Sequence, residues 1–75
     1  MALTPTLLRE CGEALYGPRW QSEMSRDLDV DDRTIRRWVA GDSSIPEGVA
    51  VDLLRLVMER AQTLDDLVPR LRRGE

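Results

Sequence analysis

The 75-residue sequence contains no histidine, no lysine and no phenylalanine, and it has a single cysteine. One cysteine excludes an internal disulfide framework, and without histidine too few ligand types are present for a structural zinc site. Cys11 also has no imidazole to activate it, so we expect a small buried hydrophobic residue and not a nucleophile. The composition therefore predicts no catalytic residue, no cofactor and no metal.

Long hydrophobic runs are missing as well. Uninterrupted apolar stretches stop at three residues, and Arg9 and Glu10 interrupt the N-terminus before the apolar core of a signal peptide could form. A membrane helix needs roughly 20 predominantly apolar residues, and no segment of the chain approaches this. We expect a soluble, cytoplasmic protein with no membrane partner.

Acidic residues outnumber basic residues in the sequence. Eleven basic and fourteen acidic residues give a net charge of −3, which argues against a protein that coats nucleic acid by bulk attraction but leaves a local basic edge possible. Every basic residue is arginine, whose planar fork suits bidentate contacts to phosphate or guanine. A GC-rich genome would produce the same arginine bias without selection for function, so both explanations stay open.

The length predicts one domain, residues 1–75, with a core too small to be very stable alone. With disulfides and zinc excluded, dimerisation is the remaining means of stabilisation. Glycine and proline divide the chain into helical pieces, and no useful stretch alternates apolar and polar residues as a strand would. The sequence predicts an all-α fold of four to five short helices.

The first two helices can be placed from their ends. Thr4 is a good N-cap with Pro5 at the first helical position, and Gly17 ends this helix before a proline. Apolar spacing predicts a short second helix from about 20 to 28. The apolar stripe of the first helix consists of Leu7, Leu8, Cys11, Ala14 and Leu15.

Aspartates cluster after the second helix. Asp27, Asp29 and Asp31 occupy places one, three and five of a calcium-loop pattern, where alternate carboxylates converge on one cation. That pattern also requires glycine at place six and glutamate at place twelve, but these places hold Asp32 and Trp38. A calcium loop is therefore excluded.

A third helix begins where these aspartates end. Asp31 is a good N-cap because its carboxylate can accept from free backbone N–H groups, and Gly41 can close the helix. Ile35, Trp38 and Val39 share one face, and we expect both tryptophans of the sequence to lie in the core. The opposite, outward face carries Asp32, Arg33, Arg36, Arg37 and Ala40.

A fourth helix is predicted from Pro46 to about Ala61, and it is more apolar than one small core requires. Beyond it, Thr63 and Asp66 resemble a capping box, and Pro69 should kink the chain. We expect one or two further turns and then a frayed basic tail. The excess apolar surface predicts a dimerisation region over 46–71, with contacts through Leu54, Met58, Leu64 and Leu67.

Residues 20–41, "WQSEMSRDLDVDDRTIRRWVAG", resemble the helix-turn-helix of the lambda-repressor-like family of phage and bacterial regulators. Two positions depart from the family pattern: Asp29 replaces the usual turn glycine, and Ser25 replaces a small alanine. The flanking "LYGPRWQ" and "IPEGV" are similar to those of short mobile-element regulators, including anti-CRISPR-associated autorepressors. The family positions are filled by Gln21, Met24, Leu28, Val30, Thr34, Ile35, Trp38 and Gly41.

The resemblance implies a homodimeric repressor that binds an inverted repeat in double-stranded DNA, without a small-molecule ligand, and that is nucleoid-associated when bound. It places Asp32, Arg33 and Arg37 over base edges in the major groove, with Arg36 at the groove wall and Gln21 near a phosphate. The chemistry agrees, because arginine can span guanine O6 and N7 and aspartate can accept from cytosine N4. Arg19 is a weaker candidate for a contact to a DNA phosphate.

Two alternatives remain. The arginines could instead form a solvated, salt-bridged face with Glu23, Asp27, Asp31 and Asp32. The chain could also be a protein-interaction module, such as an antitoxin or an anti-CRISPR-like inhibitor of a host defence complex, that uses its acidic surface. RNA binding is disfavoured because the sequence predicts no exposed aromatic platform for stacking.

Overall fold

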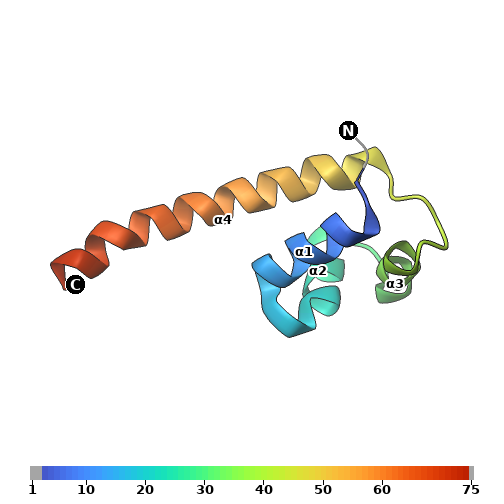
Figure 1. The fold of residues 1–75 in the computed structure, drawn as a ribbon, viewed down its shortest axis with the longest axis horizontal. Helices are drawn as coiled ribbons and strands as arrows, with labels where there is room; N and C mark the ends of the chain where they lie inside the picture. The colour runs from blue at the N-terminus through green and yellow to red at the C-terminus, as the bar shows by residue number, and fades with distance from the viewer. Residues whose placement is uncertain (1–2, 75) are drawn as a thin grey trace.

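The computed structural model describes residues 3–74, and in this part of the chain the helices are joined by turns and loops, with no strand (Figure 1). The predicted all-α class is confirmed for these residues. The elements follow one another as helices α1 (Pro5–Tyr16), the 3-10 turn η1 (Gly17–Arg19), α2 (Trp20–Leu28), α3 (Asp32–Ala40) and α4 (Glu47–Arg73).

The ends of α1 follow the predicted capping chemistry. The Thr4 hydroxyl accepts a hydrogen bond from the Leu7 backbone N–H at 3.1 Å, and Pro5 occupies the first turn. Gly17 ends the helix with φ +83°, a left-handed backbone angle that favours glycine. These local signals predicted the helix correctly because capping depends on a few adjacent residues.

The predicted apolar stripe of α1 is only partly correct. Leu8 and Leu15 are buried, but Leu7 and Ala14 are exposed and Cys11 is half-buried. The stripe is wider than the face that α1 turns toward the other helices, so its edge residues remain at the surface. The expectation of a buried Cys11 is therefore met only in part, since this side chain is half-buried against the core.

The core lies where α1, α2, α3 and the first half of α4 meet. Both tryptophans are inside it, as predicted, each with 5% of its surface exposed. Gly12 is buried against the Trp20 ring. The contact is so close that a side chain at this position would overlap the indole. The buried apolar residues are Leu8, Leu15, Trp20, Met24, Ile35, Trp38, Val49 and Leu53.

A three-residue turn connects α2 to α3. Asp29 ends α2 in the left-handed region, with φ 57° and ψ 48°. The Asp31 carboxylate then accepts from the Arg33 backbone N–H at 2.8 Å and caps α3, as the sequence predicts. At the contact between helices, the buried Ser25 hydroxyl donates to the Ser22 carbonyl at 2.7 Å, so its polarity is satisfied.

The C-terminal region differs from the prediction, because α4 is one continuous helix from Glu47 to Arg73. Thr63 does not cap a new helix, since its hydroxyl donates back to the Glu59 carbonyl at 3.1 Å. Pro69 removes one backbone hydrogen bond but does not end the helix. Leucine and arginine, both good helix formers, stand close to it, and no glycine lies between Gly48 in the first turn and Gly74, which closes the helix with φ +79°.

Figure 1 shows α1, α2 and α3 gathered at one end of the molecule while α4 runs past them, so that the molecule measures 48 × 25 × 20 Å. The first half of α4 buries Val49 and Leu53 against the core. Farther along, the Arg60 guanidinium donates to the Leu15 carbonyl at 2.7 Å. Every residue from 57 to 74 is exposed, so the second half of α4 extends beyond the core formed with the other helices.

Candidate nucleic-acid interface

Helix α3 is held by two side chains on one face. Ile35 is completely buried and Trp38 retains 5% of its surface. Because these residues turn inward, the 3.6-residue helical period directs Arg33, Arg36 and Arg37 away from the core, and all three are exposed. The prediction that the arginines lie on the outward face of this helix is confirmed.

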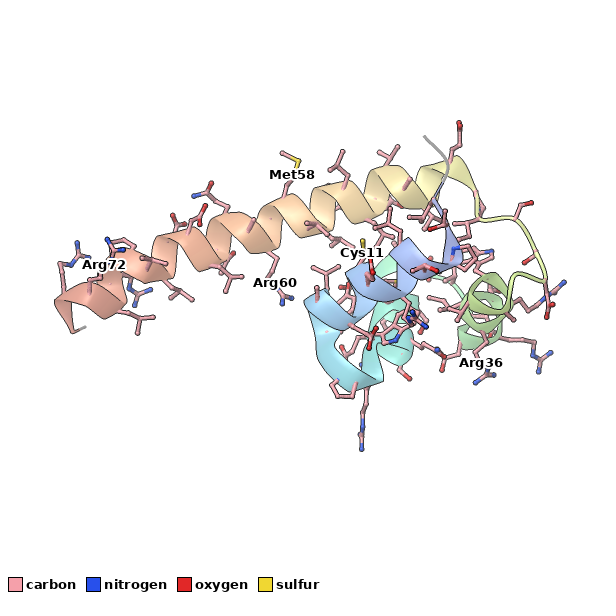
Figure 2. All side chains as sticks on the ribbon, viewed as in Figure 1. Cys11, Arg36, Met58, Arg60 and Arg72 are labelled. Carbon is pink, nitrogen blue, oxygen red and sulfur yellow. The ribbon has the colours of Figure 1, made fainter. Side chains whose placement is uncertain are left out.

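The guanidinium groups of these arginines are not neutralised by neighbouring carboxylates in the described part of the chain. The ion pairs found there join Arg9 to Glu13, Arg26 to Glu23 and Arg55 to Glu59. Figure 2 shows Arg36 extending from α3 on the side opposite α4. The sequence also allowed these arginines to form salt bridges with nearby carboxylates. Residues 3–74 do not show such a salt-bridged face on α3.

Three acidic residues near α3 have other partners. Asp31 accepts from the backbone N–H that begins the helix, and Asp27 accepts from the Tyr16 hydroxyl at 2.6 Å. Glu23 pairs with Arg26 at 2.6 Å. Asp32 lies half-buried in the first turn of α3, where the helix dipole favours a negative charge. The abundance of acid near α3 thus coexists with an arginine-rich exposed edge.

The remaining predicted contact residues lie on other elements. Gln21 is half-buried in the first turn of α2, and Arg19 is exposed in η1. The structure thus brings Asp32, Arg33 and Arg37 together on one helix but places Gln21 and Arg19 at the start of the preceding one.

A hydrogen bond that the sequence pattern did not predict fixes α2 against α1. The Tyr16 hydroxyl donates to Asp27, eleven residues away, across the turn formed by η1. Burial and this hydrogen bond to a carboxylate raise the pKa of Tyr16 well above its ordinary value of 10. No local signal predicts the bond, because it depends on how the two helices pack.

The predicted dimer residues lie far from α3 along α4. Leu54, Met58, Leu64 and Leu67 are 61%, 62%, 55% and 37% exposed. Figure 2 shows Met58 on the side of α4 that faces away from the other helices and Arg60 on the side that faces them. These apolar side chains therefore remain in water in the single chain.

A shallow apolar groove of about 170 Å³ runs between α1 and α4. Cys11 lies in it (Figure 2), and burial together with the nearby Glu10 carboxylate raises the pKa of its thiol. The thiolate is therefore disfavoured at neutral pH, which reduces its nucleophilicity. The groove is lined by Leu3, Leu7, Cys11, Ala50, Leu53, Leu54 and Val57.

Within residues 3–74 no three acidic or cysteine side chains gather closely enough to hold a metal ion. Over the same range, no helix has the length and apolar character to cross a membrane. Comparison with protein-family models, with curated proteins and with solved structures finds no match to this chain.

Proposed function

We propose that this protein is a sequence-specific DNA-binding regulator that acts as a homodimeric repressor. In this proposal α2 and α3 form a helix-turn-helix, and α3 enters the major groove. The observation that supports it most directly is the exposed edge of Arg33, Arg36 and Arg37 on a helix whose other face is anchored in the core.

The dimensions of α3 suit this role. With its side chains an α-helix is about 10 to 12 Å in diameter, and the major groove of B-DNA is about 12 Å wide, so a helix of nine residues can lie in it. Arg33 and Arg37 are four residues apart and so lie on the same side of α3, one turn from each other. Each can form a bidentate pair with guanine, and Asp32 can accept from cytosine N4.

Contacts to the DNA backbone would orient the helix. Arg36 is assigned to the groove wall, Gln21 to a phosphate at the start of α2, and Arg19 to a neighbouring phosphate. Such contacts set orientation without reading sequence. A net charge of −3 is compatible with this arrangement, because a local arginine edge that has no carboxylate partner among residues 3–74 attracts phosphate over the short range that salt allows.

A second copy completes the proposed regulator. Two recognition helices related by a two-fold axis would read half-sites about 34 Å apart in successive major grooves of an inverted repeat. Repression would be steric, because a dimer bound over a promoter excludes RNA polymerase. The exposed apolar residues of α4 supply surface for such a dimer.

The test begins with selection of binding sites from a pool of randomised duplex DNA by the purified full chain. We expect one enriched, two-fold symmetric motif. Arg33→Ala and Arg37→Ala should each weaken binding to that motif by about 5- to 150-fold, corresponding to 1–3 kcal/mol per bidentate contact. Arg9→Ala is the matched control, because Arg9 is an exposed helical arginine on α1 paired with Glu13, and this variant should bind normally.

Salt dependence provides an independent measure. A dimer that contacts about 6 to 8 phosphates should give a slope of log affinity against log salt near −5 to −7. Selection that enriches no motif, together with a flat salt response, would refute DNA binding.

A protein-interaction module is the second candidate, and the exposed apolar half of α4 is the observation that favours it. In this case the arginines of α3 would not matter for nucleic acid. Selection would then enrich no motif, and wild type and the Arg33→Ala/Arg37→Ala double variant would bind duplex DNA equally poorly. The same selection experiment therefore separates the two functions.

A further inference from the structure

Six of the exposed apolar residues of α4 follow a seven-residue repeat. Successive members are separated alternately by three and four residues, which is the spacing of the seam of a coiled coil. All are exposed in the single chain, with Leu71 at 74% and Leu54 at 61%. The seam consists of Leu54, Val57, Ala61, Leu64, Val68 and Leu71.

We infer that α4 pairs with α4 of a second copy as an antiparallel two-stranded coiled coil, in which Leu54 of one protomer packs on Leu71 of the partner subunit. This inference rests on the homodimer of the proposed function and specifies its geometry. It differs from the interface predicted from the sequence, because Met58 and Leu67 flank the seam on opposite sides. Seam layers pair residues whose numbers sum to 125, so the two-fold axis passes between Gln62 and Thr63.

Charge along α4 favours the antiparallel orientation. The helix begins with Glu47 and Asp52 and ends with Arg70, Arg72 and Arg73. Antiparallel pairing puts the acidic end of each helix beside the basic end of the other and opposes the helix dipoles favourably. Parallel pairing would instead gather six arginines at one end and four carboxylates at the other.

One cross-chain ion pair would favour the parallel orientation, between Arg60 and Asp65 of the partner subunit. The Arg60 guanidinium already donates to the Leu15 carbonyl at 2.7 Å, which holds its side chain toward α1. Because the parallel pair would compete with this bond, it does not offset the repulsion between the two arginine-rich ends.

Side-chain size favours the same orientation. Parallel pairing places each seam residue against its own copy, so Ala61 meets Ala61 and leaves the layer underfilled. In the antiparallel register, Ala61 meets Leu64 of the partner subunit, and a small residue faces a large one. Protein interiors are close-packed, so the complementary layers are the more stable arrangement.

The apolar groove between α1 and α4 gives the partner helix a place to lie. Leu54 and Val57 belong both to the seam and to the wall of this groove. In the antiparallel register they meet Leu71 and Val68 of the partner subunit, which would also cover the exposed Leu7 and the half-buried Cys11. The C-terminal half of each α4 is exposed to solvent in the single chain. In the proposed dimer it lies in the groove of the other protomer.

The same register sets the distance along the coil between the two places where α4 packs on a core. Val49 and Leu53, which pack α4 on the core, lie about 20 Å and 14 Å from the proposed two-fold axis at 1.5 Å per residue. The two cores would therefore be about 29 to 40 Å apart along the coil. This range includes the spacing of about 34 Å between successive major grooves.

Cysteine cross-linking tests the orientation. In the full chain with Cys11→Ser, a tagged Leu54→Cys protein and an untagged Leu71→Cys protein are refolded together and oxidised. We expect a disulfide-linked heterodimer, and no disulfide in either variant alone. Sedimentation equilibrium of the wild type should give twice the monomer mass of 8.6 kDa, whereas Leu64→Asp should give the monomer mass with α-helical circular dichroism retained.

Leu71→Cys homodimers that cross-link alone would overturn the inference in favour of parallel pairing. A wild-type protein that sediments as a monomer would overturn it as well. Neither outcome decides DNA binding, because motif selection and the effects of Arg33→Ala and Arg37→Ala report on that property separately. Loss of motif enrichment with a correct heterodimer cross-link would refute the proposed function alone.

Discussion

Gly12→Ala is predicted to destabilise the fold, although alanine is the better helix former. A Cβ atom at this position would overlap Cε3 and Cδ2 of Trp20 and come within 2.9 Å of Cγ. Because Trp20 is 5% exposed and begins α2, its ring cannot move without shifting that helix. The tight contact therefore couples one glycine of α1 to the position of α2 and, through it, of α3.

The expected size follows from two opposing effects. Replacing glycine by alanine inside a helix gains about 1 kcal/mol. Overpacking a well-filled core costs about 1 to 3 kcal/mol, and overlap with the body of a buried ring belongs at the upper end. The net loss should be about 1 to 2 kcal/mol, which lowers the melting temperature by roughly 4 to 16 °C for a domain of this size.

Thermal and urea denaturation followed by tryptophan fluorescence and circular dichroism would measure this loss. All variants must be compared at one protein concentration, because dimerisation makes apparent stability concentration-dependent. The matched control is Gly48→Ala in the first turn of α4, where a Cβ would meet nothing within 4 Å. It should gain about 0.5 to 1 kcal/mol. Equal stabilisation by both substitutions would refute the packing argument.

Two further predictions concern the turn and the tyrosine. Asp29→Gly should raise the free energy of unfolding by about 0.5 to 1 kcal/mol, because glycine adopts φ 57° without strain; urea denaturation giving Asp29→Ala the higher stability would contradict this. The pKa of Tyr16 is raised in the folded state, so its contribution is fully present below the unfolded pKa of about 10 and is lost as pH rises toward the folded value. Stability should fall above pH 10 in the wild type and less in Tyr16→Phe, as measured by urea denaturation across that range; identical profiles would show that Asp27 does not hold the phenol. The absence of lysine makes this comparison clean, since Cys11 is the only other side chain of the sequence with an ordinary pKa in the mildly alkaline range.

Local chemistry made the α2–α3 region predictable. Asp31 as a cap and Ile35 with Trp38 turned inward both depend on neighbours within about four residues. Such short-range patterns constrain dihedral angles and helix faces directly. The same pattern predicted the exposed arginine face of α3, because burying Ile35 and Trp38 on one side of the helix turns the arginines on the other side toward solvent.

The sequence by itself therefore determined the helical class, the boundaries of the first three helices and the residues that α3 presents to solvent. Tertiary structure decided what depends on contacts across the fold: the fit of Gly12 beneath Trp20, the bond from Tyr16 to Asp27 and the bond from Arg60 to the end of α1. It also decided how much of α4 is covered. Periodicity states which residues are apolar, but only the packing of α1 on the first half of α4 shows which apolar residues are left without a neighbour.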